Sequence, residues 1–298
     1  MSELLTETQE RLERFLDTWM PSGAEPPRKV NSAIRFALVG GHRLRPLLMI
    51  AVARAFGWLS RSVIQAAAGI ELIHTYLLVL DDVVDEARVR RGRPCCHVRY
   101  GEDVAQYACL RLSDLSLTLL VEAACAQRIS CGVVIDKVSE LRRNLIWAQE
   151  FERDLALGTV AATQKNLRTL YELKGGTWFA FITELGAVLA GTDGSNCVLA
   201  AKIGQHVGTA YQIQDDILDA TGNPDELGKA VGMDKGLKNY VTVLGLAEAR
   251  LRRDTEYQRA VSLVGRLHGD TKLLSEVIDI LRGEGQRFLH MRSYAAAT

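Results

Sequence analysis

The amino-acid sequence predicts an all-α fold, a single-domain helical bundle around a central apolar interior. The six prolines are Pro21, Pro26, Pro27, Pro46, Pro94 and Pro224. Long stretches therefore carry no proline, the residue that breaks helix interiors, and they are rich in Ala, Leu, Glu, Arg and Gln. No alternating apolar and polar run bounded by Asn-Gly or Asp-Gly turns indicates a β-hairpin.

Prolines and glycines delimit the helices expected in the first third of the chain. Residues 3–20 form an amphipathic pattern that Pro21 ends. Two helices over 29–39 and 46–57 are separated by Gly-Gly-His-Arg-Leu-Arg-Pro at 40–46. A long helix over 60–87 ends in acidic residues and is followed by an arginine-rich loop to Pro94.

The rest of the chain continues the helical pattern. Further helices are expected over about 103–127, 134–157, 166–191 and 197–220. The last of these ends at Thr-Gly-Asn-Pro over 221–224, a stop and turn signal. Two or three helices and a polar tail follow from about 241. No change of composition marks a linker and no long-period repeat occurs, so residues 1–298 are expected to form one domain.

Composition excludes several classes of protein. The 36 basic and 36 acidic residues give a net charge of zero, and with it no overall field towards nucleic acid or an anionic membrane. A hydrophobic content of 48% with 24% charged residues excludes a disordered chain. A chain of 298 residues can bury a sizeable core.

The six cysteines and the apolar segments bear on location. No Cys-x-x-Cys pair occurs, which favours reduced thiols in a cytoplasmic protein over a disulfide framework. The acidic, polar start of the chain is unlike a signal peptide. The segment 175–191 is the nearest approach to a membrane span, but it contains Glu184 and indicates a buried helix.

Two acidic clusters, Asp-Asp-Val-Val-Asp over 81–85 and Asp-Asp-Ile-Leu-Asp over 215–219, carry the strongest chemical signal. In each, the first and last acids are four residues apart and project from one helix face, where like charges repel. One such cluster fits a solvated helix end equally well. Two copies, each at the end of an apolar run, favour Mg²⁺, which prefers carboxylate oxygens and is often shared with substrate phosphates. No His/Cys cluster competes for a softer metal.

Basic residues accompany both clusters. They are Arg43, Arg45, Arg88, Arg90, Arg91, Arg93, Lys174, Lys229, Lys235 and Lys238. Guanidinium groups bind phosphate oxygens through paired hydrogen bonds. Paired carboxylates, phosphate-binding cations and a deep apolar interior together indicate a diphosphate ester with a hydrocarbon tail. No G-x-x-x-x-G-K-[ST] sequence supports P-loop chemistry.

On these residues the chain resembles the all-trans (E-type) isoprenyl diphosphate synthases, the farnesyl and geranylgeranyl diphosphate synthase family. The shared motifs lie between about residues 30 and 250. They are Gly40-Gly41-x-x-x-Arg45-Pro46, the first acidic cluster with Arg90-Arg91-Gly92, Lys174, and Gln212-x-x-Asp215-Asp216-x-x-Asp219 followed by Gly228-Lys229. The resemblance implies the isoprenoid synthase type of helical bundle.

The resemblance also implies residue roles. Mg²⁺ ions, three per active site with substrate bound, would be held by Asp81, Asp82, Asp85, Asp215, Asp216 and Asp219. The allylic diphosphate would be held by Arg90, Lys174, Lys229 and Lys238. Isopentenyl diphosphate would be held by His42, Arg45, His74 and Arg91. Gln212 would face the reacting carbons, so that the catalytic set is Asp81, Asp85, Lys174, Gln212, Asp215 and Lys229.

The family mechanism suits these residue types. Metal and cations neutralise the leaving pyrophosphate, the allylic C–O bond ionises, and the isopentenyl double bond attacks the carbocation. No protein nucleophile is required, and no Ser/His/Asp or Cys/His arrangement stands out. A lone histidine on an apolar face is usually a core residue, but the spacing of His74 from Asp81 favours a ligand role.

Tyr76 and Leu77, one turn before Asp81, are the residues expected to point down the hydrocarbon tunnel. Plain core packing is the alternative for Tyr76. A tyrosine floor with no second aromatic residue at Leu77 resembles enzymes that make C15 to C20 products, with C20, geranylgeranyl diphosphate, favoured.

Three departures from the family pattern fall on phosphate-binding positions. His42 and Gly175 stand where the family has lysine and threonine, and the stretch 234–242 lacks the expected Lys-x-Thr. In the helix near 150, either Glu152 or Asp154 takes the metal-adjacent place of the family's Gln-x-x-Asp motif.

These departures leave alternatives open. The chain is expected to elongate prenyl chains, but a different acceptor or a cyclisation would fit the same acidic clusters. A non-catalytic synthase subunit would be expected to lose the acidic clusters, and both are present here. The resemblance implies a homodimer, with the apolar helix near 105–126 as its interface or, alternatively, as intrachain core.

Overall fold

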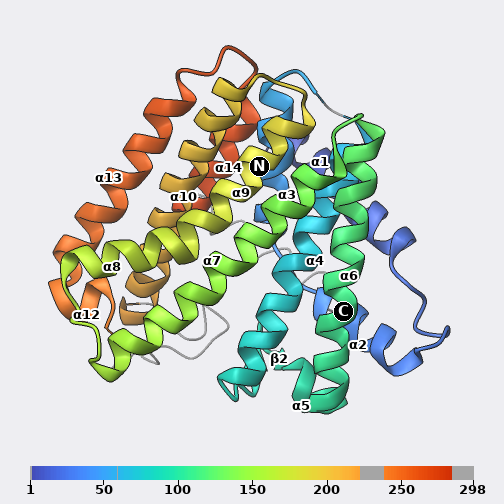
Figure 1. Cartoon of the computed structure of the whole chain (residues 1–298), viewed down its shortest axis with the longest axis horizontal. Helices are drawn as coiled ribbons and strands as arrows, with labels where there is room; N and C mark the ends of the chain where they lie inside the picture. The colour runs from blue at the N-terminus through green and yellow to red at the C-terminus, as the bar shows by residue number, and fades with distance from the viewer. Residues whose placement is uncertain (1, 59, 222–237, 284–298) are drawn as a thin grey trace.

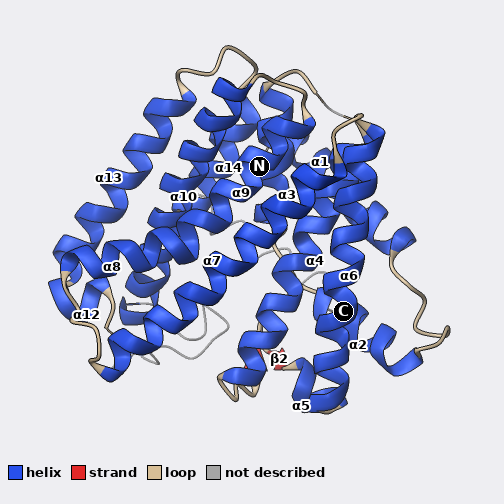
Figure 2. Cartoon of the chain, in the orientation of Figure 1, coloured by secondary structure: helices blue, strands red, loops and turns tan. Residues whose placement is uncertain are grey.

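The computed structural model describes residues 2–58, 60–221 and 238–283. It confirms the all-α prediction, because helices make up most of the described chain and its strands are two residues long (Figures 1 and 2). The helices of the first half are α1 (Glu3–Trp19), α2 (Arg28–Leu38), α3 (Leu44–Ala55), α4 (Arg61–Val84), α5 (Cys96–Tyr100) and α6 (Glu102–Ala126). Those of the second half are α7 (Cys131–Leu157), α8 (Gln164–Tyr171), α9 (Thr177–Leu189), α10 (Gly194–Thr221), α12 (Tyr240–Leu244), α13 (Leu246–Val264) and α14 (Lys272–Arg282).

The predicted helix over 166–191 is divided in the structure. Between α8 and α9 the chain forms a π-helical turn, η1 (Glu172–Gly176), which contains Lys174. A Cβ atom on Gly175 would lie 2.3 Å from the carbonyl oxygen of Gly208 in α10, so only glycine fits this close approach. Inserted turns of this kind are frequent at functional sites.

The arginine-rich loop after α4 contains a short hairpin that was not predicted. Strands β1 (Val89–Arg90) and β2 (Arg93–Pro94) pair antiparallel, with Arg90 opposite Arg93. The two residues between the strands, Arg91 and Gly92, both have positive φ, of 54° and 70°, as in a type I′ turn. The turn could not be predicted from the sequence because arginine rarely takes a positive φ.

The core lies along α3, α4 and α10. Every residue of α3 from Pro46 to Ala53 is buried, and α4 packs against α6 while α10 packs against α9 and α13 (Figure 1). Small residues permit the close helix approach. At Gly69 of α4 an added Cβ would lie 3.1 Å from the Leu120 side chain of α6. Such packing fixes the two helices that carry the acidic clusters.

Helix α4, and not the segment 175–191, is the described helix that is long and apolar enough to cross a membrane by length and composition. Its most apolar window is 72% buried inside the protein, as in the core helix of a globular fold. The helix also ends in the acidic cluster that faces α7 and α10.

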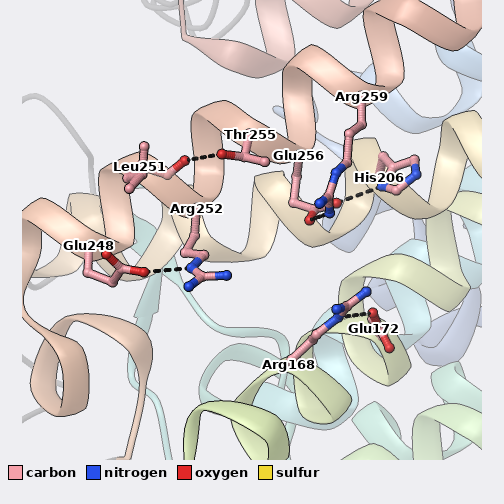
Figure 3. A network of polar contacts seen from close by, with 9 residues as sticks. All are labelled: Arg168, Glu172, His206, Glu248, Leu251, Arg252, Thr255, Glu256 and Arg259. Carbon is pink, nitrogen blue, oxygen red and sulfur yellow. Dashed lines mark hydrogen bonds and ion pairs between the residues drawn. The ribbon is translucent and has the colours of Figure 1, made fainter.

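A polar network on the outside of the bundle ties α13 to α10 (Figure 3). His206 of α10 contacts Glu256 of α13 with 2.6 Å between Nδ1 and Oε2, and Arg259 donates to the other carboxylate oxygen at 2.6 Å. Burial opposes ionisation of Glu256, but the hydrogen bond from His206 and the charge of Arg259 outweigh it and lower the pKa of this carboxyl. The network therefore holds α13 against α10, the helix that carries the second acidic cluster.

Candidate active site

The two acidic clusters line one cleft of about 1070 Å³ between α4, α7, η1 and α10. From the first cluster come Asp81 and Asp85, and from the second come Asp215, Asp216 and Asp219. Helix α7 contributes Gln149, Glu150, Glu152, Arg153 and Asp154. The clusters are 134 residues apart in sequence, and they converge because the C-terminal ends of α4 and α10 both reach this cleft.

The first cluster is held in a state that resists ionisation. Burial raises the pKa of Asp81 to about 6; Lys174 opposes the shift and Asp85 adds to it. Burial likewise raises the pKa of Asp85, with Glu152 contributing a like charge. Carboxylates with raised pKa values gain from a cation beside them, so the site is suited to metal.

The second cluster is anchored by a tyrosine that the sequence did not single out. The hydroxyl of Tyr171, at the end of α8, donates to Oδ2 of buried Asp216. The backbone N–H of Tyr240 donates in turn to the Tyr171 hydroxyl at 3.2 Å, and the two rings pack 4.8 Å apart. Burial and the charge of Asp216 raise the pKa of Tyr171, which keeps its proton. Asp216 is therefore oriented by a fixed donor, as ligands in metal sites usually are.

Lys174 and Glu152 meet across the cleft, with Nζ 2.7 and 2.9 Å from the two carboxylate oxygens. Burial lowers the pKa of Lys174, but Glu152 outweighs it, so the net pKa is raised and the ammonium stays charged. Asp154 also lines the cleft, but its carboxylate accepts from the Thr159 hydroxyl at 3.0 Å. Of the two acids left open by the sequence, Glu152 faces the predicted phosphate-binding lysine.

Asp82 lies outside this cleft. It is 3% exposed and accepts a 2.7 Å hydrogen bond from Arg90 Nε. Both residues line a small neighbouring pocket of about 50 Å³ together with Arg91. Metal binding by Asp82, and diphosphate binding by Arg90, would require this ion pair to open, and both roles remain predictions.

Three of the residues predicted to bind isopentenyl diphosphate, Arg45 of α3, His74 of α4 and Arg91 of the β1–β2 turn, lie close enough to interact electrostatically. Arg45 Nη1 lies 3.1 Å from His74 Nε2. Burial, followed by the charges of Arg45 and Arg91, lowers the pKa of His74 well below its usual value, so the ring is neutral and accepts from Arg45. Nε of Arg45 is buried with no hydrogen-bond partner among the described residues, as expected of a donor that binds a ligand.

The remaining predicted residues occupy different places. Gln212 and Lys238 line the cleft, and His42 lies exposed in the loop before α3. Tyr76 and Leu77 do not line the cleft; Tyr76 is buried between helices, and Leu77 packs against the same core. Lys229 lies outside the described residues.

Arg43, grouped with the phosphate-binding residues from its sequence position, has another role. It is buried in a salt-bridge network with Glu71 at 2.6 Å and Glu13 at 2.8 Å. Burial disfavours its charge, but these two carboxylates outweigh burial and raise its pKa. Arg43 therefore joins α1 to α4 and leaves Arg45 as the arginine available to substrate.

The donor set of the cleft fits Mg²⁺. Its carboxylate oxygens are the ligands that this ion prefers. In the described part of the chain, no three acidic, histidine or cysteine side chains converge closely enough to hold an ion by themselves. An ion here would take its other ligands from water and from substrate phosphates, which is the usual coordination of Mg²⁺ in phosphate-transfer sites.

Comparison with known proteins agrees with this geometry. A family model described as polyprenyl synthetase matches residues 27–281. The farnesyl diphosphate synthase of Bacillus subtilis is 29% identical over 292 residues, 94% of this chain and 97% of that protein. The farnesyl diphosphate synthase of Escherichia coli is 32% identical over 258 residues, 82% of this chain and 85% of that protein.

Solved structures share the fold. A geranylgeranyl pyrophosphate synthase superposes with a TM-score of 0.84 at 21% identity, covering 95% of this chain and 99% of the other. The FPP/GFPP synthase of Zymomonas mobilis superposes with a TM-score of 0.77 at 25% identity, covering 93% and 97%. The chain belongs to the polyprenyl synthetase family and is a polyprenyl diphosphate synthase, a prenyltransferase of isoprenoid biosynthesis.

Proposed function

We propose that the protein condenses an allylic diphosphate with isopentenyl diphosphate, with Mg²⁺, to give a short all-trans product of C15 to C20. The observation that carries the proposal is the single cleft in which acids of α4 and α10 face Lys174 of η1. Acids to hold a divalent ion and a cation to hold phosphate are both needed to stabilise a leaving pyrophosphate.

The residues divide the work by position. Asp81, Asp85 and Asp219 would hold Mg²⁺, which would neutralise the developing charge on the pyrophosphate. Lys174 would leave Glu152 and donate to a phosphate oxygen as the allylic C–O bond breaks. Gln212, on the same wall as Asp215, would face the carbocation that results.

The second substrate would bind beside Arg45 of α3 and Arg91 of the β1–β2 turn. Arg45 and Arg91 would contact the diphosphate of isopentenyl diphosphate, and neutral His74 would hold Arg45 in place. The isopentenyl double bond attacks the allylic carbon, and the new carbocation loses a proton to the departing pyrophosphate. His42 stands exposed where the family has lysine, so it would add little charge at pH 7.

Within the proposed range we favour C20, geranylgeranyl diphosphate. Relatives named for farnesyl and for geranylgeranyl products match the chain about equally well, at 32% identity in Escherichia coli and in Arabidopsis thaliana. The support is Tyr76, a single aromatic residue before the first cluster. Replacing Tyr76 with alanine is expected to lengthen the product, and an unchanged chain-length distribution would contradict the role.

Product analysis tests the reaction. The protein is incubated with Mg²⁺, isopentenyl diphosphate and a C5, C10 or C15 allylic diphosphate in turn, and the products are identified. Elongation to C20 that EDTA abolishes is the expected result. Pyrophosphate release without elongation would replace the proposal with another acceptor or a cyclisation, and no turnover with any starter would favour a non-catalytic subunit.

A homodimer is proposed as the working state. Tyr107 and Leu110, neighbours on one face of α6, are 60% and 63% exposed. A second copy covering this face would bury them, whereas the opposite face of α6, with Ala105, Ala108 and Leu112, is already buried within the chain. Light scattering after size exclusion would give twice the chain mass, and a monomeric mass would overturn this assignment.

A further inference from the structure

Aliphatic side chains form two walls of the cleft close to the first acidic cluster. Leu80 and Val84 project from α4, and Ile146 and Leu157 project from α7. All four are among the exposed large apolar residues, at 43% to 73% of their surface. Apolar walls beside a phosphate-binding end are suited to the hydrocarbon tail of a substrate.

The face of α4 that carries Leu80 and the face of α7 that carries Ile146 contact each other one helical turn further from the first acidic cluster. Residues four apart lie on one face of a helix, so Tyr76 continues the face of Leu80 and Arg142 continues the face of Ile146. There the two side chains touch: Arg142 Nε donates to the Tyr76 hydroxyl at 3.3 Å. Helices α4 and α7, which form two walls of the cleft, are therefore joined by this contact one turn beyond the apolar residues.

A third helix completes the bridge. Arg142 Nη2 donates to the Ser113 hydroxyl of α6 at 2.7 Å, and its guanidinium carbon lies 5.8 Å from the centre of the Tyr76 ring. Tyr76 itself is only 8% exposed and belongs to the main core cluster. The bridge thus joins α4, α6 and α7 at the level where the apolar walls end.

We propose that Arg142, through its contacts with Tyr76 and Ser113, closes the hydrocarbon end of the cleft and sets the longest product. This inference rests on the proposed chain elongation, which supplies a tail that grows towards this point. A tail reaching Tyr76 would have to displace a charged group from two hydrogen bonds and surround it with hydrocarbon. Burial of a charge without partners is strongly unfavourable, whereas an apolar side chain in the same place would only change rotamer.

The neighbouring residue supplies a matched control. Arg143 is on the same helix, but its side chain is 72% exposed and pairs with Glu140 at 3.7 Å. Replacing Arg143 with methionine removes the same charge from α7 and leaves the contacts of Arg142 with Tyr76 and Ser113 in place. Replacing Arg142 with methionine keeps a long side chain at the closure and removes its charge and its hydrogen bonds.

The experiment compares products from isopentenyl diphosphate and a C5 starter for the wild type, Arg142→Met, Arg143→Met and Ser113→Ala. We expect Arg142→Met to lengthen the main product by at least one five-carbon unit and Arg143→Met to leave it unchanged. Ser113→Ala, which removes the shorter of the two hydrogen bonds, is expected to shift the distribution the same way but less. If Arg142→Met shows no folding transition and is therefore unfolded, the product-length distribution of Ser113→Ala tests the proposal instead.

The outcomes separate the two proposals. A wild-type protein that elongates while both closure variants keep its product distribution, or shorten it, overturns the role of Arg142 and leaves the proposed function standing. A wild-type protein that does not elongate any starter overturns both. Longer products from Arg143→Met as well as Arg142→Met would trace the effect to net charge on α7, and would overturn the closure.

Discussion

Lys174 and Glu152 form an ion pair across the cleft, with the ammonium nitrogen within 2.9 Å of both carboxylate oxygens. The pair joins the π-helical turn to α7 at the point where an allylic diphosphate is expected to bind. Because the charge of Lys174 also opposes the burial that raises the pKa values of Asp81 and Asp85, it favours the ionised acidic cluster as well as the substrate.

Replacing Lys174 with alanine is expected to reduce kcat/KM for the allylic diphosphate by about 10- to 100-fold, the loss of one charge-assisted hydrogen bond of about 1.5–3 kcal/mol. Steady-state kinetics at saturating isopentenyl diphosphate measure it. Lys137→Ala is the control, because Lys137 forms a 2.6 Å ion pair with Glu184 away from the cleft. Equal losses in the two variants would assign the effect to stability and contradict the role of Lys174.

Tyr171→Phe should weaken metal binding, since the ring stays while the donor to Asp216 and the acceptor for the Tyr240 backbone N–H are lost. Groups that orient metal ligands typically change affinity by about 10- to 100-fold when removed. The readout is the Mg²⁺ concentration that gives half-maximal activity. Tyr257→Phe is the control: it removes a buried hydroxyl that donates to the Leu281 carbonyl and is not part of the cleft lining, so this concentration should stay unchanged. An unchanged Mg²⁺ requirement in Tyr171→Phe would refute the orienting role.

The raised pKa of Asp81, about 6 against an ordinary value of 3.8, predicts a pH dependence. The folded chain holds a proton at this site that the unfolded chain releases, so the stability from this group is present below pH 3.8 and lost as the pH rises through 6. Mg²⁺ requires the ionised carboxylate and competes with that proton, so its Kd should rise about tenfold per pH unit below 6. Calorimetric titration at about pH 5 and about pH 7.5, on either side of this pKa, measures the change, and Asp81→Asn should reduce it to the part that comes from Asp85, whose pKa is also raised. Equal affinity at both values would contradict the prediction.

The general fold and the composition of the cleft follow from local signals in the sequence. Proline-free stretches marked the long helices, and both acidic clusters do face one cleft. Their spacing alone predicts that acids four residues apart repel each other, and this repulsion indicates a bound cation. The resemblance assigns Arg45 and His74 to one substrate, and the two side chains lie 3.1 Å apart.

The features of the site that could not be predicted from the sequence depend on contacts between residues far apart in the chain. Tyr171 is 45 positions from Asp216, and a tyrosine at the end of a short amphipathic helix carries no signal of its partner. Glu152 and Asp154 differ only in which one faces η1, which depends on the rotation of α7 within the bundle. Arg142 was invisible for the same reason: an arginine beside Arg143 on a helix gives no sign that one is turned inward and one outward.

Gly175, where the family has threonine, is expected to be required by packing, so Gly175→Thr should destabilise the protein and not improve catalysis. A Cβ atom there would lie 2.3 Å from the Gly208 carbonyl oxygen and 3.0 Å from Gln212 Cβ, and a backbone carbonyl inside α10 cannot move aside. Overpacking of this kind costs about 1–3 kcal/mol, and thermal unfolding would register it as a lower Tm. Gly194→Ala is the control, because nothing lies within 4 Å of the Cβ atom that alanine would add at the start of α10. A Tm equal to that of the wild type, together with tighter binding of the allylic diphosphate, would instead mean that the threonine hydroxyl is the missing substrate donor.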